Sequence, residues 1–252
     1  MFPKKIFLCL LLLLPAGIFA QVLNVESLRF LNDTDGWMGQ VRLSFAAENN
    51  GNEVYNFGNT VHVQYKKGRS RLILLNNLDL EKANGEDFIN TGYQHVRYNY
   101  RLGDDSPWTA EAFVQSQYNK PMKMDFRGCA GVGPRYRLFK RDNFHCYLAA
   151  LYMYEHEIDD GGRAVYDDHR LDSYLSFSWK MAKNLEIVNT VYYQPLFADF
   201  NDYRISEDFI FTANFTKHFG IGTVFGLLKD TKQPPGVPEL SWHFGQSLTY
   251  AF

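Results

Sequence analysis

Apolar and polar residues alternate with a period of two along most of this chain, and this pattern constrains the fold more than any other feature. Successive side chains of a β-strand point to opposite faces, so the pattern gives a sheet one apolar and one polar face. The same rhythm recurs in residues 88–102 and 202–217. It is plain in the first segment, where apolar Trp37, Val41, Leu43 and Phe45 alternate with polar Gln40, Arg42 and Ser44. We therefore predict an all-β, antiparallel fold.

The predicted strands are long. Most exceed the about 5–6 residues usual in soluble proteins and match the about 9–11 residues that cross a bilayer at a tilt. After residue 20, no segment reaches the about 18 consecutive apolar residues that indicate a spanning helix. We predict a transmembrane β-barrel of twelve strands at residues 36–48, 54–66, 69–81, 88–102, 107–119, 122–138, 143–158, 168–181, 184–197, 202–217, 219–229 and 239–252.

The predicted connections alternate in length. Outer-membrane barrels have short periplasmic turns and longer outside loops. With both chain ends in the periplasm, the longer connections all fall outside the cell. The short turns are expected at residues 67–68, 103–106, 140–143, 182–183 and near 218, and the longer ones at 49–53, 81–87, 159–167, 198–201 and 230–238.

Composition supports a membrane barrel and excludes one class of partner. The chain holds 16 Tyr, 21 Phe and 4 Trp in 252 residues. Barrels use many aromatic residues because girdles of them sit at both membrane interfaces. The formal net charge is −2, so no basic field favours nucleic acid as a partner.

The N-terminus has the order of a secretory signal peptide. Two lysines precede an apolar run at 6–14, and residues 15–20 end in small side chains before Gln21. We expect residues 1–20 to be cleaved, leaving one domain at 21–252. Cys9 follows Leu8 rather than a small residue, which disfavours lipid attachment. Residues 21–35 are expected to form a short N-terminal strand or a rim segment.

The last predicted strand ends in an aromatic residue. Leu248, Tyr250 and Phe252 share one face, and Phe252 is the final residue. This arrangement resembles the sorting signal that the barrel-assembly machinery of bacteria reads. The resemblance implies two partners, the barrel-assembly machinery and outer-membrane lipid, and a location in a Gram-negative envelope.

Strand parity predicts charged side chains on the lumenal face. One candidate group comprises Arg127, Glu155, Glu157, Arg170 and Asp172. A second candidate group, closer to the periplasm, comprises Arg97, Arg101, Glu111 and Arg135. Counting across the hairpins places Glu155 near both Arg127 and Arg170, which we expect to hold it.

Two interpretations of these groups remain open. They form a selectivity ring or a ligand site in a narrow pore that passes a small solute. Alternatively they form a structural ion-pair network that fills the lumen. About eight strands leave an interior filled by side chains, and about 16–18 leave an open channel. Twelve falls between, and the bulky lumenal side chains favour the filled interior.

Other chemistry is weakly supported. Cys129 and Cys146 are expected on opposite faces of neighbouring strands, which disfavours a disulfide. The carboxylates of the longest predicted outer loop lack calcium-loop spacing, so an ordinary solvated loop is favoured over a Ca²⁺ site. No zinc motif is present, and no cofactor or metal is expected. These loop carboxylates are Asp159, Asp160, Asp167 and Asp168.

An outer-membrane lipid hydrolase is an alternative function, because some twelve-stranded barrels place His and Ser on the lipid-facing surface. Here Ser173 has no His beside it on the predicted lipid face. Ser241 and His243 lie on the lumenal face of the last strand. A nucleophile needs a base and an orienting group, so we expect no enzyme.

Seven stretches resemble the domain-of-unknown-function family 481, a group described as salt-induced outer-membrane proteins. The resemblance is clearest over residues 90–252 and implies a barrel in the outer envelope, with no reaction or ligand to carry over. The expected function is therefore a narrow small-solute channel or a structural, stress-related envelope protein. A soluble secreted β-sandwich binding protein is the third alternative. The stretches are Gly92–Tyr100, Glu111–Asn119, Arg127–Arg137, Tyr152–Glu157, Tyr192–Pro195, Asp202–Ile205 and Pro234–Val237.

Overall fold

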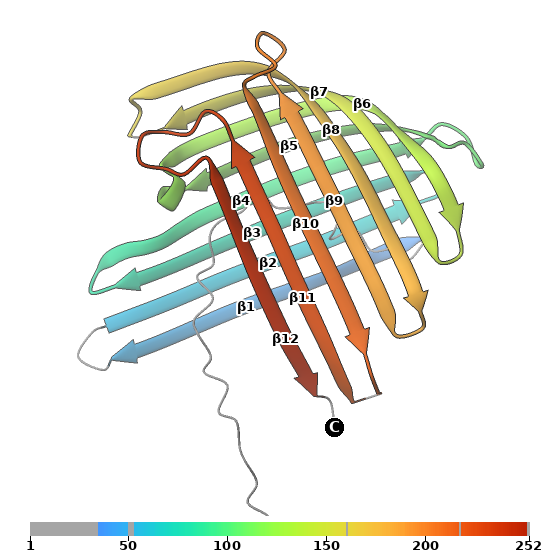
Figure 1. Cartoon of the computed structure of the whole chain (residues 1–252), viewed down its shortest axis with the longest axis horizontal. Helices are drawn as coiled ribbons and strands as arrows, with labels where there is room; N and C mark the ends of the chain where they lie inside the picture. Colours follow the sequence, from blue (N-terminus) through green and yellow to red (C-terminus); the bar gives the residue numbers. More distant parts are fainter. Residues whose placement is uncertain (1–34, 50–52, 160, 217, 251–252) are drawn as a thin grey trace, which may run out of the picture.

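The computed structural model describes residues 35–49, 53–159, 161–216 and 218–250. The predicted signal peptide, almost all of the segment at 21–35 and the terminal Phe252 lie outside the described residues. Within them, one antiparallel sheet holds twelve strands in sequential order (Figure 1), which confirms the predicted class. The elements are β1 (Gly36–Asn49), β2 (Glu53–Lys67), β3 (Ser70–Ala83), β4 (Glu86–Arg101), β5 (Trp108–Asn119), the 3₁₀ turn η1 (Lys120–Met122), β6 (Met124–Arg141), β7 (Phe144–Asp159), β8 (Ala164–Ala182), β9 (Leu185–Pro195), β10 (Tyr203–Asn214), β11 (Phe219–Asp230) and β12 (Leu240–Tyr250).

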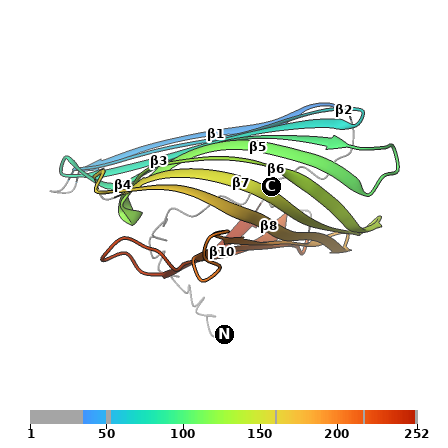
Figure 2. The same cartoon turned by 90° about the horizontal axis from the view of Figure 1, so that it is seen from above.

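The sheet curls back on itself. Figure 2 shows β1–β4 on one side of the molecule and β10 on the other, with β6–β8 between them. Within the described part of the chain, no ladder joins β1 to β12. The polar residues of β1 that were predicted to face the interior are exposed, because among the described strands this edge strand pairs with β2 alone. They are Gln40, Arg42 and Ser44.

Burial alternates along the strands as the sequence predicts. On β4, Arg97 is 2% exposed, whereas its chain neighbour Tyr98 is 44% exposed. His95 and Asn99 share the buried face with Arg97. We call the buried face of the sheet the inner face and the other the outer face. A polar inner face with an exposed apolar outer face is the reverse of a soluble sheet protein.

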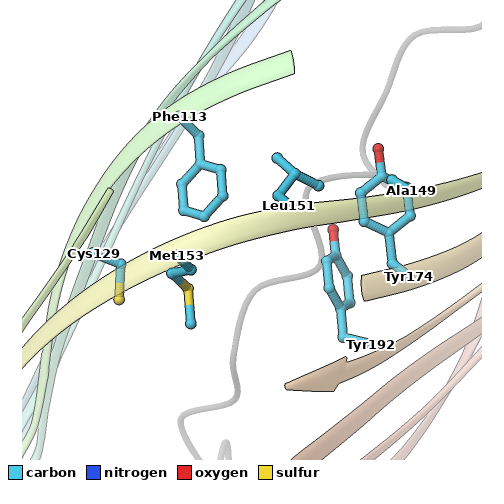
Figure 3. Packing of buried hydrophobic residues seen from close by; sticks show 7 residues of the cluster. All are labelled: Phe113, Cys129, Ala149, Leu151, Met153, Tyr174 and Tyr192. Atoms are coloured by element: carbon cyan, nitrogen blue, oxygen red, sulfur yellow. The ribbon is translucent and has the colours of Figure 1, made fainter. Parts of the chain in front are cut away.

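An apolar layer crosses the middle of the inner face. On β7, Leu151 and Met153 are fully buried, with Glu155 following toward one strand end and Tyr147 preceding toward the other. The inner face therefore changes from charged to apolar and back to polar along one strand. Figure 3 shows the seven buried side chains of this layer, from β5–β9: Phe113, Cys129, Ala149, Leu151, Met153, Tyr174 and Tyr192.

Aromatic contacts gather toward both strand ends on the outer face. At the end where β1 begins, the contacting rings are Trp37–Tyr65, Trp108–Tyr136, Phe144–Trp179 and Phe215–Phe219. Toward the opposite end, they are Tyr152–Phe197 and Tyr193–Tyr203. Between these two groups the outer face exposes aliphatic side chains, among them Leu74, Val114, Leu148 and Leu175.

The predicted sorting of turns by length is only partly right. The connection expected as a longer loop at 81–87 is a two-residue turn at Asn84 and Gly85, because β3 and β4 extend further than predicted. Both turn residues have positive φ, of 52° and 85°, as tight hairpin turns require. The longest connections, 196–202 and 231–239, do lie at the end opposite the start of β1.

Candidate functional site

Glu155 of β7 lies at the centre of a buried ion-pair network. Its side chain is 0% exposed and contacts three arginines from three other strands. Arg127 Nε of β6 donates to Glu155 Oε2 at 2.7 Å. Arg170 Nε of β8 donates to Oε1 at 3.3 Å, and Arg204 Nη1 of β10 reaches both oxygens at 2.6 Å. Both carboxylate oxygens are thus satisfied by charge-assisted hydrogen bonds.

The same arginines hold further carboxylates. Arg204 Nη2 donates to Glu157 at 2.7 Å, and Arg127 Nε lies 3.5 Å from the same carboxylate. Arg170 binds Asp168 at 2.9 Å and Asp202 at 3.0 Å. We call the set the Glu155 network: Arg127, Glu155, Glu157, Asp168, Arg170, Asp202, Arg204 and Asp230, the last of which accepts from Arg204 Nε. Nearly every member is buried, so the network depends on mutual pairing rather than on water.

The sequence predicts part of this network. The structure brings Arg127, Glu155, Glu157 and Arg170 together. Asp202, Arg204 and Asp230 are members that the sequence analysis did not place in either group, and Asp168 was expected in a solvated outer loop. Asp172, predicted in the group, accepts a 2.8 Å hydrogen bond from Gln194 Nε2 instead.

The second predicted group divides in two. Arg97 Nη1 lies 3.1 Å from Glu111 Oε1, and both side chains are buried. Asn99 and Tyr174 also donate to this carboxylate, at 2.6 Å and at 3.0–3.1 Å. The Tyr174 hydroxyl reaches it from β8, three strands away from β5 in the sheet order. This bond therefore crosses the concave interior.

Tyr174→Phe is expected to destabilise the folded protein by about 1.5–3 kcal/mol, because hydrogen bonds to charged groups contribute this much. The Glu111 carboxylate would keep Arg97 and Asn99 but lose its contact across the interior. Urea unfolding in detergent micelles measures the change. Tyr98→Phe is the matched control, since the Tyr98 hydroxyl bonds Ser70 at an exposed position. Equal stability of the two variants would contradict this role of Tyr174.

Arg101 and Arg135, the other two members of the second group, line a separate cavity. Its volume is about 180 Å³, and it opens beside the turns that follow β2, β4 and β6. We call it the cationic cavity because its lining holds basic residues and no Asp or Glu. Arg135 stacks over the ring of Tyr147 with 3.7 Å between the guanidinium carbon and the ring centroid.

A much smaller void separates the network from the second group. It measures about 20 Å³ and is lined by residues of the apolar layer together with Arg97, Arg127 and Asp172. A site of this size holds about one water molecule. This void lies beside the apolar layer, against Phe113, Met153 and Tyr192.

Residues considered for other chemistry do not converge. Ser173 Oγ donates to the backbone oxygen of Tyr193 at 2.8 Å. Asp167 bonds Tyr154 and His156 on the outer face, whereas Asp168 bonds Arg170 on the inner face. Asp160 lies outside the described residues.

Cys129 and Cys146 are both buried free thiols, which agrees with the prediction against a disulfide. Of the predicted sorting signal, Leu248 is exposed on β12. The side chain of Tyr250 and all of Phe252 lie outside the described part. The role of the C-terminus in sorting therefore stays a prediction.

A twelve-stranded antiparallel sheet with charged groups inside and an apolar band outside defines the class of porin-like β-barrel folds. The solved "NanC porin structure in rhombohedral crystal form" is similar in fold, with a TM-score of 0.50 and 11% identity over 85% of this chain and 100% of that chain. A "Bacterial polysaccharide outer membrane secretin" gives a TM-score of 0.43 and 10% identity over 87% and 86%, a likeness too weak to argue from.

The chain belongs to the family described as "Protein of unknown function, DUF481", whose model matches residues 41–252. This confirms the family resemblance drawn from the sequence. No curated protein matches the chain.

Proposed function

We propose that this protein is an outer-membrane β-barrel whose interior is closed by packed side chains, and that it serves the envelope as a structural component. The observation that carries the proposal is the Glu155 network, in which Glu155 is 0% exposed while three arginines bind it. Such an interior favours the filled barrel over the open small-solute channel.

The outer face supports a membrane location. Exposed aliphatic side chains form a band between two groups of aromatic rings, as the interfaces of a bilayer require. In water, an exposed band of this kind would cause aggregation. Strands of 11–19 residues are long enough to cross the hydrocarbon core at a tilt.

The inner face supports closure. Water can pass a barrel only where the interior leaves a continuous path. Here the apolar layer of Leu151, Met153 and Tyr174 follows the Glu155 network along β7 and β8. The void beside this layer is about 20 Å³, which admits about one water molecule.

Heat-modifiable gel migration after outer-membrane fractionation tests the location. A folded barrel is expected in the outer-membrane fraction and to migrate faster before boiling than after it. A chain that stays soluble without detergent would overturn the membrane proposal and favour a secreted β-sandwich.

Planar bilayers test closure. The wild type is expected to give no steady conductance, because the apolar layer blocks the path. The double variant Met153→Ala with Tyr174→Ala removes two side chains of that layer and is expected to raise conductance. Leu175→Ala, on the outer face of β8, is the matched control and should give no steady conductance. Steady wild-type conductance would contradict the closed interior.

We also propose that the barrel is not an acyl hydrolase. The Ser173 hydroxyl donates to a backbone oxygen rather than to a histidine, so no base activates it. An assay of phospholipid hydrolysis in mixed micelles tests this, and turnover that is lost in Ser173→Ala would overturn it.

A further inference from the structure

We propose that the cationic cavity is a binding site for a small solute with at least two negative charges, carried by phosphate or carboxylate groups. The inference rests on the proposed function only for the side of the membrane that the cavity faces. The cavity lies at the end of the sheet where β1 begins and β12 ends. In the proposed barrel this is the periplasmic end.

The lining is strongly one-sided in charge. Of its 14 residues, five are arginine, two are lysine and one is histidine, and none is acidic. Neutral polar residues stand opposite the arginines in the sheet: Asn99 pairs with Arg71, and Thr109 pairs with Arg135. The cavity therefore concentrates positive charge without carboxylates between the cations, which attracts anions.

Three carboxylates lie beside the lining: Asp35 and Asp104 at the rim, and the buried Glu111, which accepts from the lining residue Asn99 at 2.6 Å and is already paired with Arg97. Asp35 bonds Lys66 at 3.2 Å, and its own side chain is 56% exposed. Asp104 lies 3.9 Å from Arg69 and is 90% exposed. Because both of these carboxylates are exposed, water screens the two pairs and weakens them. In the Glu155 network, by contrast, five carboxylates surround three arginines. The two ends of the interior thus differ in charge.

The arginine geometry suits an oxyanion. The Nε of Arg101 is enclosed and has no hydrogen-bond partner among the described residues. A guanidinium group presents parallel N–H donors that match phosphate or carboxylate oxygens. The guanidinium carbon of Arg135 lies over the Tyr147 ring, 3.7 Å from its centroid, and this cation–π contact holds the guanidinium group at the cavity. The cavity volume of about 180 Å³ is smaller than the about 300 Å³ of typical drug-sized sites, so a small anion fits best.

Isothermal titration calorimetry on the full mature chain, folded in detergent micelles, tests the site with pyrophosphate and, separately, with citrate. Saturable binding is expected for at least one of the two anions, weakening as sodium chloride is raised because salt screens the charges. The phosphate and carboxylate arms show which chemistry the site prefers. An uncharged disaccharide should give no saturable heat.

Arg101→Gln is expected to raise the dissociation constant at least about tenfold, since a hydrogen bond to a charged group contributes enough for that change. Arg137→Gln is a second lining variant, in case the first fails to fold. Lys183→Gln is the matched control, because this exposed lysine lies in a turn at the same end of the sheet but outside the cavity.

Two results would overturn the site: no saturable heat with either anion, or equal weakening in Lys183→Gln and Arg101→Gln. These outcomes are separate from those of the proposed function. A soluble chain that binds pyrophosphate would overturn the membrane proposal and leave the anion site standing. A closed, heat-modifiable barrel that binds neither anion would overturn the anion site alone.

Discussion

Glu155→Gln is expected to lower the free energy of unfolding by about 3–5 kcal/mol, the cost of removing one charged partner from a buried ion-pair network. The amide keeps the shape of the side chain but presents one oxygen where three arginines now share two. Its NH₂ group would face guanidinium donors that need acceptors. The positive charges of Arg127, Arg170 and Arg204 would then be poorly compensated inside the protein.

Thermal and urea unfolding in detergent micelles measure this effect, followed by the mobility difference between boiled and unboiled samples. Glu239→Gln is the matched control, since this glutamate is exposed in the connection between β11 and β12. It should change stability by less than about 0.5 kcal/mol. An unfolding temperature for Glu155→Gln equal to that of the wild type would contradict a stabilising role for the network.

Gly133→Ala is expected to cost about 1–3 kcal/mol through overpacking between β6 and β7. A Cβ atom built on Gly133 would lie 2.6 Å from Leu151 Cα and closer still to the carbonyl oxygen of Ala150. Both obstacles are backbone atoms, so no side-chain rotation relieves the clash. The two strands would have to separate at this point, beside the apolar layer.

Folding yield in detergent and urea unfolding measure the cost of Gly133→Ala. Gly245→Ala on β12 is the control, because nothing lies within 4 Å of its Cβ position and its φ is not positive. Gly131→Ala should fall between the two, since the obstacle there is the ring of Phe113. If Gly133→Ala folds as well as Gly245→Ala, the close approach of the two backbones has no energetic consequence.

The strands could be predicted from the sequence because their period is two. A shift of one residue moves every side chain of a strand to the opposite face, so the apolar set of a strand fixes its orientation. Arg97, Arg127 and Glu155 were placed inside on this ground and are buried. Strand ends were predicted less well. The hairpins β3–β4 and β7–β8 extend into residues 81–87 and 159–167, which were predicted as loops.

Contacts between distant strands could not be predicted in the same way. Parity shows that Arg204 points inward, but only the curvature of the sheet shows that it meets Glu155, 49 residues earlier in the chain. The bond between Tyr174 and Glu111 has the same origin. Parity likewise grouped Arg101 with Arg97. The two lie at different positions along β4, so Arg97 pairs with Glu111 whereas Arg101 lines the cationic cavity.

The two edges of the sheet have a consequence for the proposed membrane location. In the described residues, each of β1 and β12 has one neighbour, so the far side of each presents a row of backbone donors and acceptors. Hydrocarbon offers these groups no partner, and each one left unsatisfied costs several kcal/mol. In the proposed membrane location the two edges must therefore pair with each other or with a strand of another molecule, and this pairing determines whether the barrel is built from one chain or from several.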